Sequence, residues 1–532
     1  MSKNITSLSF RKGLEQNLFE EIQRLAEPGN SDIRENIDHI AKEYHIGTSS
    51  VLGAMSFYDF TKKENLHKKV HVCNGTSCMC AGTQDKVTNI LKTHFDETEI
   101  GHVSCLGRCH ENSAFMYNGN VYSADNEKDI DNIINKKNIS YQNRYHTGSF
   151  CETPILTKPD EDLNSFYQVL HKYKDDPSKI ISELKDSKLR GRGGAGFPFH
   201  LKLEACSKET SEQKYIVCNA DEGDPGAYSD MYLMEHRPHK ILFGMLAAGL
   251  ATGADTGVLY IRKEYPNSIV TVNKAIEEFQ KLGVSDFTFK VISGAGAYVC
   301  GEETALLNSI EGKRAEVRIR PPYPVSAGLY NKPTVLSNVE TFANINRILQ
   351  YGGKEYARLG TERSTGVKLI SLDSSFNRPG IYEVEMGTPL ADVVHKMGKG
   401  MKAKVKAFQI GGPLGGIVPF SEIDKLTIDF ESFQQAGYLL GHASIVGIPE
   451  DFPMLKFMHH LFEFTAAESC GKCYPCRIGS VRGKEMVEEA LANGTDINTE
   501  LFNDLLETME LGSLCALGSG LPLPVKNILE KF

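Results

Sequence analysis

In the stretch LRGRGGAGFP (residues 189–198), Gly191, Gly193 and Gly196 fit the dinucleotide-binding pattern G-x-G-x-x-G. That pattern is informative where it follows a strand and opens a helix. Here the preceding residues 177–189 have helical spacing, and a proline follows the glycines. The glycines therefore predict a different loop, in which backbone N–H groups can closely approach an anion. A purely structural loop is the alternative.

Charged and polar residues near this loop suit a nucleotide ligand. Arg190, Arg192 and Lys202 add positive charge around it. Acidic side chains at strand ends can accept hydrogen bonds from ribityl or ribose hydroxyls, although each alone could belong to a solvated face. Two strand ends carry such residues: Asn219, Asp221, Glu222 and Asp224 in CNADEGDPG (218–226), and Tyr298, Glu302 and Glu303 in GAGAYVCGEETALL (294–307). A cation, a flat ring and an amide follow at Arg320, Tyr323 and Asn338.

Four cysteines near the end of the sequence have the spacing of [4Fe–4S] ligands. Cys470, Cys473 and Cys476 form C-x2-C-x2-C, and Cys515 follows in SLC. Two-residue gaps let one loop place three thiolates at three corners of a cubane, which a distant fourth cysteine completes. Zinc is the alternative, but zinc sites usually bring cysteines in separated pairs. The three-plus-one arrangement therefore favours an iron–sulfur cluster.

A second set of cysteines suits a [2Fe–2S] cluster, with zinc again the alternative. It consists of Cys73 and Cys78 in CNGTSC (73–78) and of Cys105 and Cys109 in SCLGRC (104–109). Cys80 is a rival ligand, but Cys78 is preferred because Gly75 then turns the intervening loop. His102 and His110 are expected at the surface, since four thiols are already available. We expect the remaining thiols, Cys151, Cys206, Cys218 and Cys300, to be ordinary buried or partly buried side chains.

The composition limits the class of protein. The 532 residues suggest about three or four domains. A net charge of −9 argues against non-specific nucleic-acid binding, and no run of about 18 apolar residues predicts a membrane span. The first residues, MSKNITSLSF, lack a signal-peptide core. We therefore expect a cytoplasmic protein, in which thirteen cysteines indicate metal or redox chemistry rather than disulfides.

Hydrophobic periodicity divides the sequence into units of different character. The expected order is a helical segment (1–66), a small α/β unit (67–140), a linker (141–160), an α/β unit (161–360), a strand-rich unit (361–445) and a helical C-terminal unit (446–532). The alternation of helices and strands in the larger α/β unit predicts strands that end in ligand-carrying loops. The apolar run 241–254 predicts a buried helix.

Taken together and in this order, these motifs resemble one family. LRGRGGAGFP, CNADEGDPG, GAGAYVCGEETALL, NVET and ESCGKCYPCR…SLC are similar to the NADH-oxidising flavoprotein subunit of respiratory complex I. SVLGAMSFYDF, CNGTSC and SCLGRC are similar to its small [2Fe–2S] partner. The fusion of both resembles the diaphorase subunits of soluble NAD-dependent formate dehydrogenases and NAD-reducing hydrogenases.

The resemblance implies a multidomain α/β and α fold. It comprises a helical N-terminus, a thioredoxin-like [2Fe–2S] domain, an α/β FMN- and NADH-binding domain, a β-grasp domain and a C-terminal helical bundle with a [4Fe–4S] cluster. The implied FMN contacts are Gly191, Gly193, Lys202, Asn219, Asp221, Tyr298, Gly301, Glu302, Glu303 and Asn338. The implied NADH contacts are Phe197, Glu222, Asp224, Arg320 and Tyr323. Asp224 departs from the family, which usually has a glutamate there.

The implied activity is an NADH dehydrogenase, or diaphorase, that exchanges a hydride between NAD(H) and FMN and relays single electrons through the clusters. No general acid or base is required from the chain. The expected partners are NADH or NAD and further iron–sulfur redox subunits, of formate dehydrogenase, hydrogenase or electron-bifurcating type. Electron flow in either direction is compatible with this sequence. A cluster-carrying assembly scaffold without nucleotide turnover is the alternative.

Overall fold

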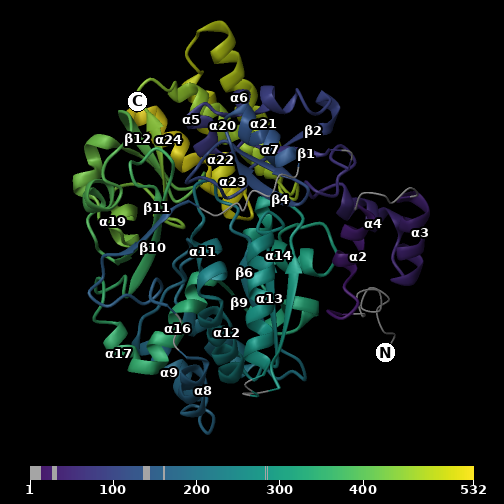
Figure 1. Cartoon of the computed structure of the whole chain (residues 1–532), viewed down its shortest axis with the longest axis vertical. Helices are drawn as coiled ribbons and strands as arrows, with labels where there is room; N and C mark the ends of the chain where they lie inside the picture. Colours follow the sequence, from purple (N-terminus) through teal and green to yellow (C-terminus); the bar gives the residue numbers. More distant parts are fainter. Residues whose placement is uncertain are drawn as a thin grey trace.

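The computed structural model describes residues 13–26, 33–66, 68–135, 144–159, 162–281, 283 and 286–532. The stretch MSKNITSLSF lies outside these ranges. Figure 1 shows the N-terminal helices at one side, a parallel sheet below the centre, a second sheet opposite the N-terminal helices, and the small sheet and C-terminal helices together above. Within the described residues, none of the helices combines the length and the apolar character needed to cross a bilayer.

Three short helices come first: α2 (Leu18–Leu25), α3 (Ile33–Glu43) and α4 (Thr48–Met55). They share a small apolar core, as their periodicity predicts. Two aromatic anchors attach this unit to the parallel-sheet unit. The ring of Phe19 lies 6.2 Å from that of Tyr260, and the Tyr58 hydroxyl donates to the carbonyl of Lys313 at 2.7 Å.

The small sheet has the strand order β2-β1-β3-β4. β1 pairs parallel with β2 and antiparallel with β3, and β3 and β4 form a hairpin that turns at Asn118–Gly119. The elements are β1 (Val70–Cys73), α5 (Thr76–Ala81), α6 (Gln84–Leu91), η1 (Glu97–Glu99), β2 (Ile100–Val103), β3 (Ala114–Tyr117), β4 (Asn120–Ser123) and α7 (Glu127–Ile134).

The parallel sheet has the order β8-β7-β6-β9, so the carboxyl ends of its strands meet at one edge. Its strands are β6 (Tyr215–Ala220), β7 (Thr256–Ile261), β8 (Thr288–Ser293) and β9 (Thr334–Asn338). The helices before and between them are α8 (Leu163–His171), α9 (Ser178–Asp186), α10 (Phe199–Lys208), α11 (Ser229–His236), α12 (Pro238–Thr252), α13 (Pro266–Gln280), η2 (Tyr298–Gly301), α14 (Glu303–Ile310), α15 (Pro324–Ala327) and η3 (Leu329–Asn331). After β9 come α16 (Val339–Tyr351) and α17 (Gly353–Tyr356). The apolar run 241–254 forms most of α12 and is buried, as predicted.

The second sheet has the order β13-β12-β14-β10-β11-β5. Its edge strand β5 (His146–Ser149) comes from the segment expected to be only a linker, and it pairs parallel with β11. The buried carboxylate of Glu383 accepts hydrogen bonds from the backbone of Ile155, Leu156 and Thr157, which fastens this segment. The other elements are β10 (Val367–Leu372), β11 (Gly380–Glu385), α18 (Leu390–Asp392), η4 (Val393–Met397), β12 (Val405–Ile410), β13 (Gly416–Pro419), η5 (Phe420–Lys425), α19 (Phe430–Gln435) and β14 (Ser444–Pro449).

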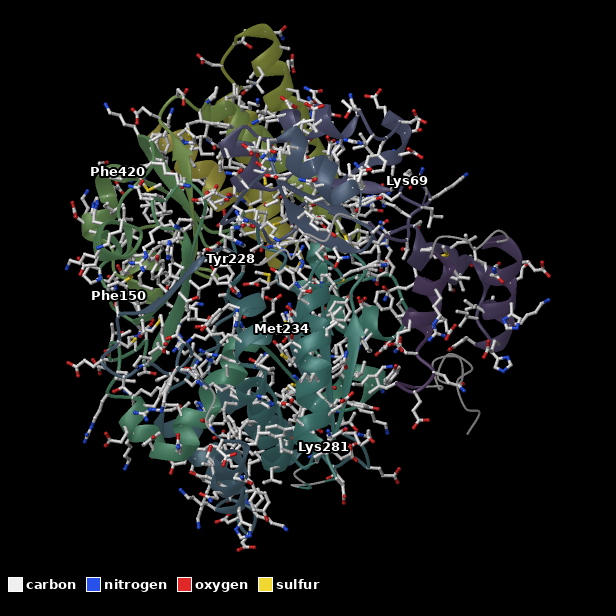
Figure 2. All side chains as sticks on the ribbon, in the orientation of Figure 1. Lys69, Phe150, Tyr228, Met234, Lys281 and Phe420 are labelled. Carbon is white, nitrogen blue, oxygen red and sulfur yellow. The ribbon has the colours of Figure 1, made fainter. Side chains whose placement is uncertain are left out.

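Five helices complete the chain: α20 (Met454–Glu468), α21 (Tyr474–Asn493), α22 (Thr499–Gly512), α23 (Ala516–Gly520) and α24 (Pro522–Lys531). α20 and α21 pack closely because Gly483 has no side chain. A Cβ there would lie 2.1 Å from the ring of Phe462. The buried side chains of the different units meet near the middle of the molecule, where Figure 2 places Tyr228.

Candidate functional site: three loop clusters at one junction

The glycine loop is a backbone cradle between α9 and α10. The N–H of Gly191 donates to the carbonyl of Phe197 at 2.8 Å, which closes the loop. Gly194 and Gly196 have φ values of +118° and +60°, which glycine adopts without strain. A Cβ on Gly193 would lie 3.1 Å from the Cβ of Asn338, so this glycine lets the loop rest against the start of α16.

The arginines of the loop do not supply the free positive charge that the sequence suggested. Arg192 is fully buried, and its guanidinium donates to the Thr365 carbonyl and the Tyr356 hydroxyl. Arg190 forms an ion pair with Glu431 at 2.6 Å. Glu431 therefore neutralises the positive charge of Arg190, whereas Arg192 is turned into the interior, where its partners are uncharged.

The loop after β6 faces the glycine loop at the carboxyl edge of the parallel sheet. The amide nitrogen of Asn219 donates to the Gly301 carbonyl at 2.8 Å, which joins this loop to the one after β8. The backbone N–H of Asp221 donates to Asn219 Oδ1 at 3.1 Å. Burial raises the pKa of Asp221 well above its usual range, and its Oδ2 has no protein partner.

Two carboxylates, at the end of the loop after β8 and the start of α14, lie close to cations from two other segments. Glu302 caps α14 by accepting the backbone N–H groups of Thr304 and Ala305, both at 2.9 Å. Glu303 pairs with Lys202 and Arg320, each at 3.0 Å. Although burial opposes the shift, these two cations lower the pKa of Glu303. The structure thus brings the four predicted residues Lys202, Glu302, Glu303 and Arg320 together.

Tyr298 and Asp224 form another pair within the candidate site. The Tyr298 hydroxyl donates to Asp224 Oδ1 at 2.7 Å. Glu222, which was predicted beside them as a nucleotide contact, points elsewhere. It is 4% exposed, and its carboxylate accepts the backbone N–H groups of Asp230 and Met231 at the start of α11.

The two predicted aromatic contacts of the nucleotide lie at the surface. Phe197 is 48% and Tyr323 57% exposed, which leaves their rings free to stack on a planar ligand. The residues present fit FMN, because two buried polar atoms at this edge of the sheet lack protein partners. They are the donor Asn338 Nδ2 and the carboxyl oxygen Asp221 Oδ2, both suited to a polar flavin.

The first cysteine set converges in the small sheet. Cys73 ends β1, Cys78 lies in α5, and Cys105 and Cys109 follow β2; all four are buried. The sulfurs of Cys105 and Cys109 are 3.8 Å apart, and the thiol of Cys73 is within hydrogen-bonding reach of Cys78 and Cys105. Four convergent sulfurs fit a [2Fe–2S] cluster. Three backbone N–H groups donate to these sulfurs, from Gly75, Gly107 and Gly226.

The rival residues near this set lie apart from it. Cys80 is only partly buried, and it packs with the C-terminal helices. His102 is exposed, as predicted, but the prediction of a surface position is wrong for His110. Its ring is buried between Tyr145 and Tyr228 at centroid distances of 5.0 and 4.7 Å. Cys151, Cys206, Cys218 and Cys300 are buried or partly buried, as predicted.

The second cysteine set converges between the C-terminal helices. Cys470 follows α20, Cys473 and Cys476 lie at the start of α21, and Cys515 precedes α23. The four belong to one apolar cluster with residues of η2 and α14. Burial raises the pKa of Cys476 to about 11 and that of Cys515 to about 12. Four sulfurs in a sheltered, largely apolar site fit a [4Fe–4S] cluster.

Three family descriptions match consecutive parts of the chain. Residues 18–138 match the thioredoxin-like [2Fe–2S] ferredoxin family, residues 184–347 the Nuo51 FMN-binding domain, and residues 456–532 the NADH-ubiquinone oxidoreductase-F iron–sulfur binding region.

Curated relatives span most of the chain. The alpha subunit of the NAD-reducing hydrogenase HoxS of Cupriavidus necator is 32% identical over 90% of this chain and 84% of its own length. The chain belongs to the family of NADH-quinone oxidoreductase F subunits and NAD-reducing hydrogenase alpha subunits. The F 2 subunit of the NADH-quinone oxidoreductase of Rhizobium meliloti is 40% identical over 67% of this chain and 87% of its own length. HndC, a subunit of the NADP-reducing hydrogenase of Solidesulfovibrio fructosivorans, is 39% identical over 67% of this chain and 75% of its own length.

A solved structure extends the match to the whole fold. The chain superposes on one chain of an NAD+-reducing [NiFe]-hydrogenase in the H2-reduced state with a TM-score of 0.86. The sequence identity is 28%, and 97% of this chain and 91% of that chain are covered. As a member of this family, the chain is an NADH oxidoreductase subunit with FMN, [2Fe–2S] and [4Fe–4S] domains.

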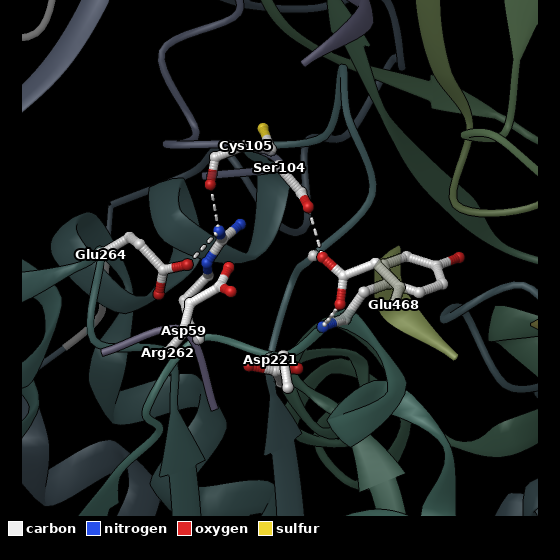
Figure 3. Close-up of a pocket in the computed structure, with 11 residues that line it drawn as sticks. Asp59, Ser104, Cys105, Asp221, Arg262, Glu264 and Glu468 are labelled. Carbon is white, nitrogen blue, oxygen red and sulfur yellow. Dashed lines mark hydrogen bonds and ion pairs between the residues drawn. The ribbon is translucent and has the colours of Figure 1, made fainter. Parts of the chain in front are cut away.

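In this family member, one buried carboxylate joins the three loop clusters. Glu468 accepts a hydrogen bond from the Ser104 hydroxyl, next to Cys105, and one from the Tyr298 backbone N–H at 2.8 Å (Figure 3). Glu468 itself lies two residues before Cys470. Burial raises its pKa to about 7. The candidate flavin loop and both cysteine sets therefore meet at this one side chain.

Around Glu468 lies a small cavity with room for about one water molecule. Its charged lining residues are Asp59, Asp221, Arg262, Glu264 and Glu468 (Figure 3). Arg262 donates to the Cys105 carbonyl at 2.5 Å and to Glu264 at 2.7 Å. Sequence reasoning missed Arg262, Glu264 and Glu468, because no local spacing links them to the cofactor motifs.

Proposed function

We propose that the chain is the module of a larger enzyme in which NAD(H) and iron–sulfur carriers exchange electrons through a flavin. When bound, FMN exchanges a hydride with NAD(H) and electrons one at a time with the clusters. The convergence of the flavin loop and both cysteine sets on Glu468 carries this proposal. It supports cofactor sites that are close enough for direct electron transfer.

The chain's own residues bind and orient the cofactors. The backbone of Gly191 and Gly193 carries no side chain toward the proposed flavin, and a hydrogen bond from Asn219 to its carbonyl holds Gly301 in place. Asn338 Nδ2 offers an unpaired donor, and Asp221 Oδ2 an unpaired carboxyl oxygen. The remaining proposed FMN contacts are Lys202, Tyr298, Glu302 and Glu303. The proposed NADH contacts are Phe197, Asp224, Arg320 and Tyr323, whereas Glu222 acts indirectly, by holding the backbone of the loop after β6.

Cys73, Cys78, Cys105 and Cys109 are the proposed [2Fe–2S] ligands, and Cys470, Cys473, Cys476 and Cys515 the proposed [4Fe–4S] ligands. Burial closes the first set to solvent, while Cys473 and Cys515 of the second are partly exposed. Exposed apolar side chains lie close to these cysteines in the sequence: Tyr474 follows Cys473 and is 74% exposed, and Leu514 precedes Cys515 and is 42% exposed. Exposed apolar patches mark contact sites. We place the electron-accepting or electron-donating iron–sulfur subunit there.

We propose a hydrogenase as the parent complex, since the relative that spans 90% of this chain is named as a hydrogenase subunit. Mass analysis of the co-purifying chains distinguishes the alternatives. A molybdenum or tungsten protein would indicate a formate dehydrogenase, and a further flavoprotein would indicate an electron-bifurcating complex. A cytoplasmic location is supported by thirteen cysteines without a disulfide.

Two substitutions at Asn338 test the flavin site. The side chain caps α16 by accepting the Thr341 backbone N–H at 3.1 Å, and its Nδ2 is unpaired. Asn338→Asp keeps the cap but removes the donor, so we expect an unchanged melting temperature and at least tenfold weaker FMN binding. Asn338→Ala removes both, and should also cost about 1 kcal/mol of stability. FMN titration of the deflavinated protein and thermal unfolding measure the two effects.

The same titration separates the module from an assembly scaffold. If the unmodified protein takes up no FMN, the proposed function is wrong.

A further variant tests whether electrons leave the flavin through the [4Fe–4S] cluster. Cys473→Ser should leave NADH-dependent flavin bleaching intact in stopped-flow absorbance and abolish electron transfer to an external acceptor that draws on the clusters. An unchanged onward rate would contradict the ligand assignment.

A further inference from the structure

A buried histidine outside the proposed cofactor contacts joins the second sheet to the loop after β6. His442 lies just before β14 and is 5% exposed. Its Nε2 lies 3.3 Å from Asp230 Oδ2, and its Nδ1 lies 3.7 Å from Glu222 Oε1 and 3.4 Å from the Ser229 hydroxyl. Because the two carboxylates lie on opposite sides of the ring, they suit a positively charged imidazolium, whose Nε2 can donate to Asp230 and whose Nδ1 lies within ion-pair distance of Glu222.

The charges around the ring favour this protonated form. Burial lowers the pKa of His442, but Asp230 and then Glu222 outweigh it and raise the pKa to about 9. Two other charged groups act on this cluster. Lys368 opposes the rise in the pKa of His442. Burial raises the pKa of Asp224, and the positive charge of His442 offsets part of that rise. Lys368 is itself neutralised by a buried ion pair with Glu340.

The turn that presents His442 is conformationally costly. Ala443 has a φ of +62°, in the left-handed region that non-glycine residues rarely occupy, and Gly441 before His442 has a φ of +54°. Such strain persists where the surrounding structure over-determines it, and it concentrates at functional positions. The backbone of this turn also backs the glycine loop, since a Cβ on Gly194 would lie 3.5 Å from Gly441.

The carboxylates that hold His442 close the loop 222–230 at both ends. Glu222 stands at its start and accepts the backbone N–H of Asp230, at its end, at 2.9 Å. The Tyr265 hydroxyl adds a further hydrogen bond to Glu222 at 3.1 Å. Between these ends the N–H of Gly226 donates to Cys109 Sγ at 3.1 Å.

β14, the strand that follows His442, packs against the loop that carries the hydrogen bond from the Gly226 N–H to Cys109 Sγ. A Cβ on Gly226 would lie 2.7 Å from Val446 in β14, so the loop is pressed against Cys109 by this strand. His442 and Val446 thus belong to one segment and both contact the loop 222–230. We call the set of His442, Glu222 and Asp230 the clamp. It connects the second sheet, through the loop 222–230, to a sulfur of the small sheet.

We propose that His442 is a positioning residue that holds the loop 222–230 so that the Gly226 N–H bonds to Cys109 Sγ and raises the reduction potential of the [2Fe–2S] cluster. Hydrogen bonds to cluster sulfurs favour the reduced, more negative state. This inference rests on the proposed function, because it takes Cys109 as a ligand. It also explains why Glu222 points away from the nucleotide contacts.

A metal ion is the competing occupant of this cluster. Single ligand atoms of Glu222, Asp230 and His442 lie within 4.8 Å of one another. However, the two carboxylates face opposite nitrogens of the ring, and one ion cannot bind both nitrogens. Both oxygens of Glu222 also already accept backbone N–H groups. The geometry therefore favours a clamp made by the imidazolium.

The test compares His442→Gln, His442→Ala and the unmodified holoprotein by redox titration monitored by electron paramagnetic resonance. In His442→Ala the [2Fe–2S] midpoint should fall, so that the reduced-to-oxidised ratio at a fixed potential decreases roughly tenfold, equivalent to about 59 mV for a one-electron couple. The nearly isosteric His442→Gln keeps one donor, and should shift the midpoint less in the same direction. The [4Fe–4S] midpoint should stay unchanged and serves as the control within each molecule.

Three results would overturn the clamp. They are an unshifted [2Fe–2S] midpoint in both variants, an equal shift of both clusters, or a stoichiometric metal other than iron that is lost in His442→Ala. Failure of the proposed function is distinguishable from these. In that case the unmodified protein itself would show no [2Fe–2S] signal after reduction.

Discussion

A buried ion pair shows how single residues connect the units of the chain. Lys368 in β10 and Glu340 in α16 are both fully buried and form an ion pair. The other oxygen of Glu340 accepts the Leu369 backbone N–H at 3.1 Å. The pair therefore joins the second sheet to the parallel-sheet unit beneath the candidate site.

Removing one partner of this pair should destabilise the protein strongly. Glu340→Ala leaves the Lys368 ammonium unpaired in the interior, and we expect a loss of about 3–5 kcal/mol in the free energy of unfolding. Glu355→Ala, which breaks the exposed pair with Arg358, should cost less than about 1 kcal/mol. Urea unfolding measures both variants. Similar losses for the two would contradict a structural role of the buried pair.

A buried neutral histidine should make the small sheet sensitive to acid. His71 in β1 lies against the ring of Phe60, and burial, assisted by Lys263 and Lys68, lowers its pKa to about 4. Because the folded state binds its proton less tightly than the unfolded chain, stability is lost as the pH falls from about 6.5 to about 4. We expect a loss of roughly 1–3 kcal/mol from this residue.

His71→Phe keeps a flat ring that cannot take up a proton, so the melting temperature should fall less between pH 7 and pH 5. His39→Gln, on the exposed face of α3, is the control and should behave as the unmodified protein. Differential scanning calorimetry at both pH values gives the comparison. An unchanged pH dependence in His71→Phe would show that other groups control the acid response.

The sequence was informative about residues whose chemistry depends on local spacing, and less so about the direction of side chains. Both cysteine sets converge because their motifs are short loops beside strand or helix ends. The directions of the Arg192, Glu222 and His110 side chains could not be predicted, because distant segments decide where they point. Thr365 draws Arg192 inwards, and α11 draws Glu222. No pattern near these residues contains that information.

Among the elements, those with strong periodicity were predicted and those stabilised by pairing were not. α12 was predicted from the apolar run 241–254. β5 has the sequence HTGS, which alternates no apolar residues, and it is held by backbone pairing with β11. The linker expected over residues 141–160 therefore contains a strand that the sequence did not indicate. Backbone hydrogen bonds to a neighbouring strand are enough to stabilise a strand at a sheet edge, and the sequence does not indicate which strand that neighbour is.

The crossing of α12 and α16 should depend on one glycine. A Cβ on Gly244 would lie 2.1 Å from the backbone oxygen of Phe342, so Gly244→Ala must separate the helices. We expect a loss of about 1–3 kcal/mol. Gly53→Ala in α4 is the matched control, because nothing lies within 4 Å of its added Cβ. That variant should gain about 0.5–1 kcal/mol from helix propensity. Chemical unfolding that ranks them in the opposite order would contradict the packing argument.

At the scale of the whole molecule, the small sheet is docked between the other units rather than attached by its linker. Ser77 bonds to Asp373 at 3.0 Å, Ser104 to Glu468, and the Ser374 N–H donates to the Cys109 carbonyl at 2.9 Å. These contacts surround the [2Fe–2S] cysteines. The interface alone specifies how the small sheet docks on the other units. The covalent link between them raises their effective concentration for one another.

This docking predicts that the chain can be divided and still assemble. Two co-expressed pieces, split between residues 135 and 144, should co-purify. Gly107→Ala in the first piece should abolish co-purification, because its Cβ would lie 2.4 Å from the ring of Tyr265 across the interface. Gly119→Ala is the matched control: it has a similar positive φ, +74° against +72°, but nothing within 4 Å. If both variants co-purify equally well, the interface does not depend on this close approach. If neither the variants nor the unmodified pieces assemble, the linker and not the interface holds the small sheet in place.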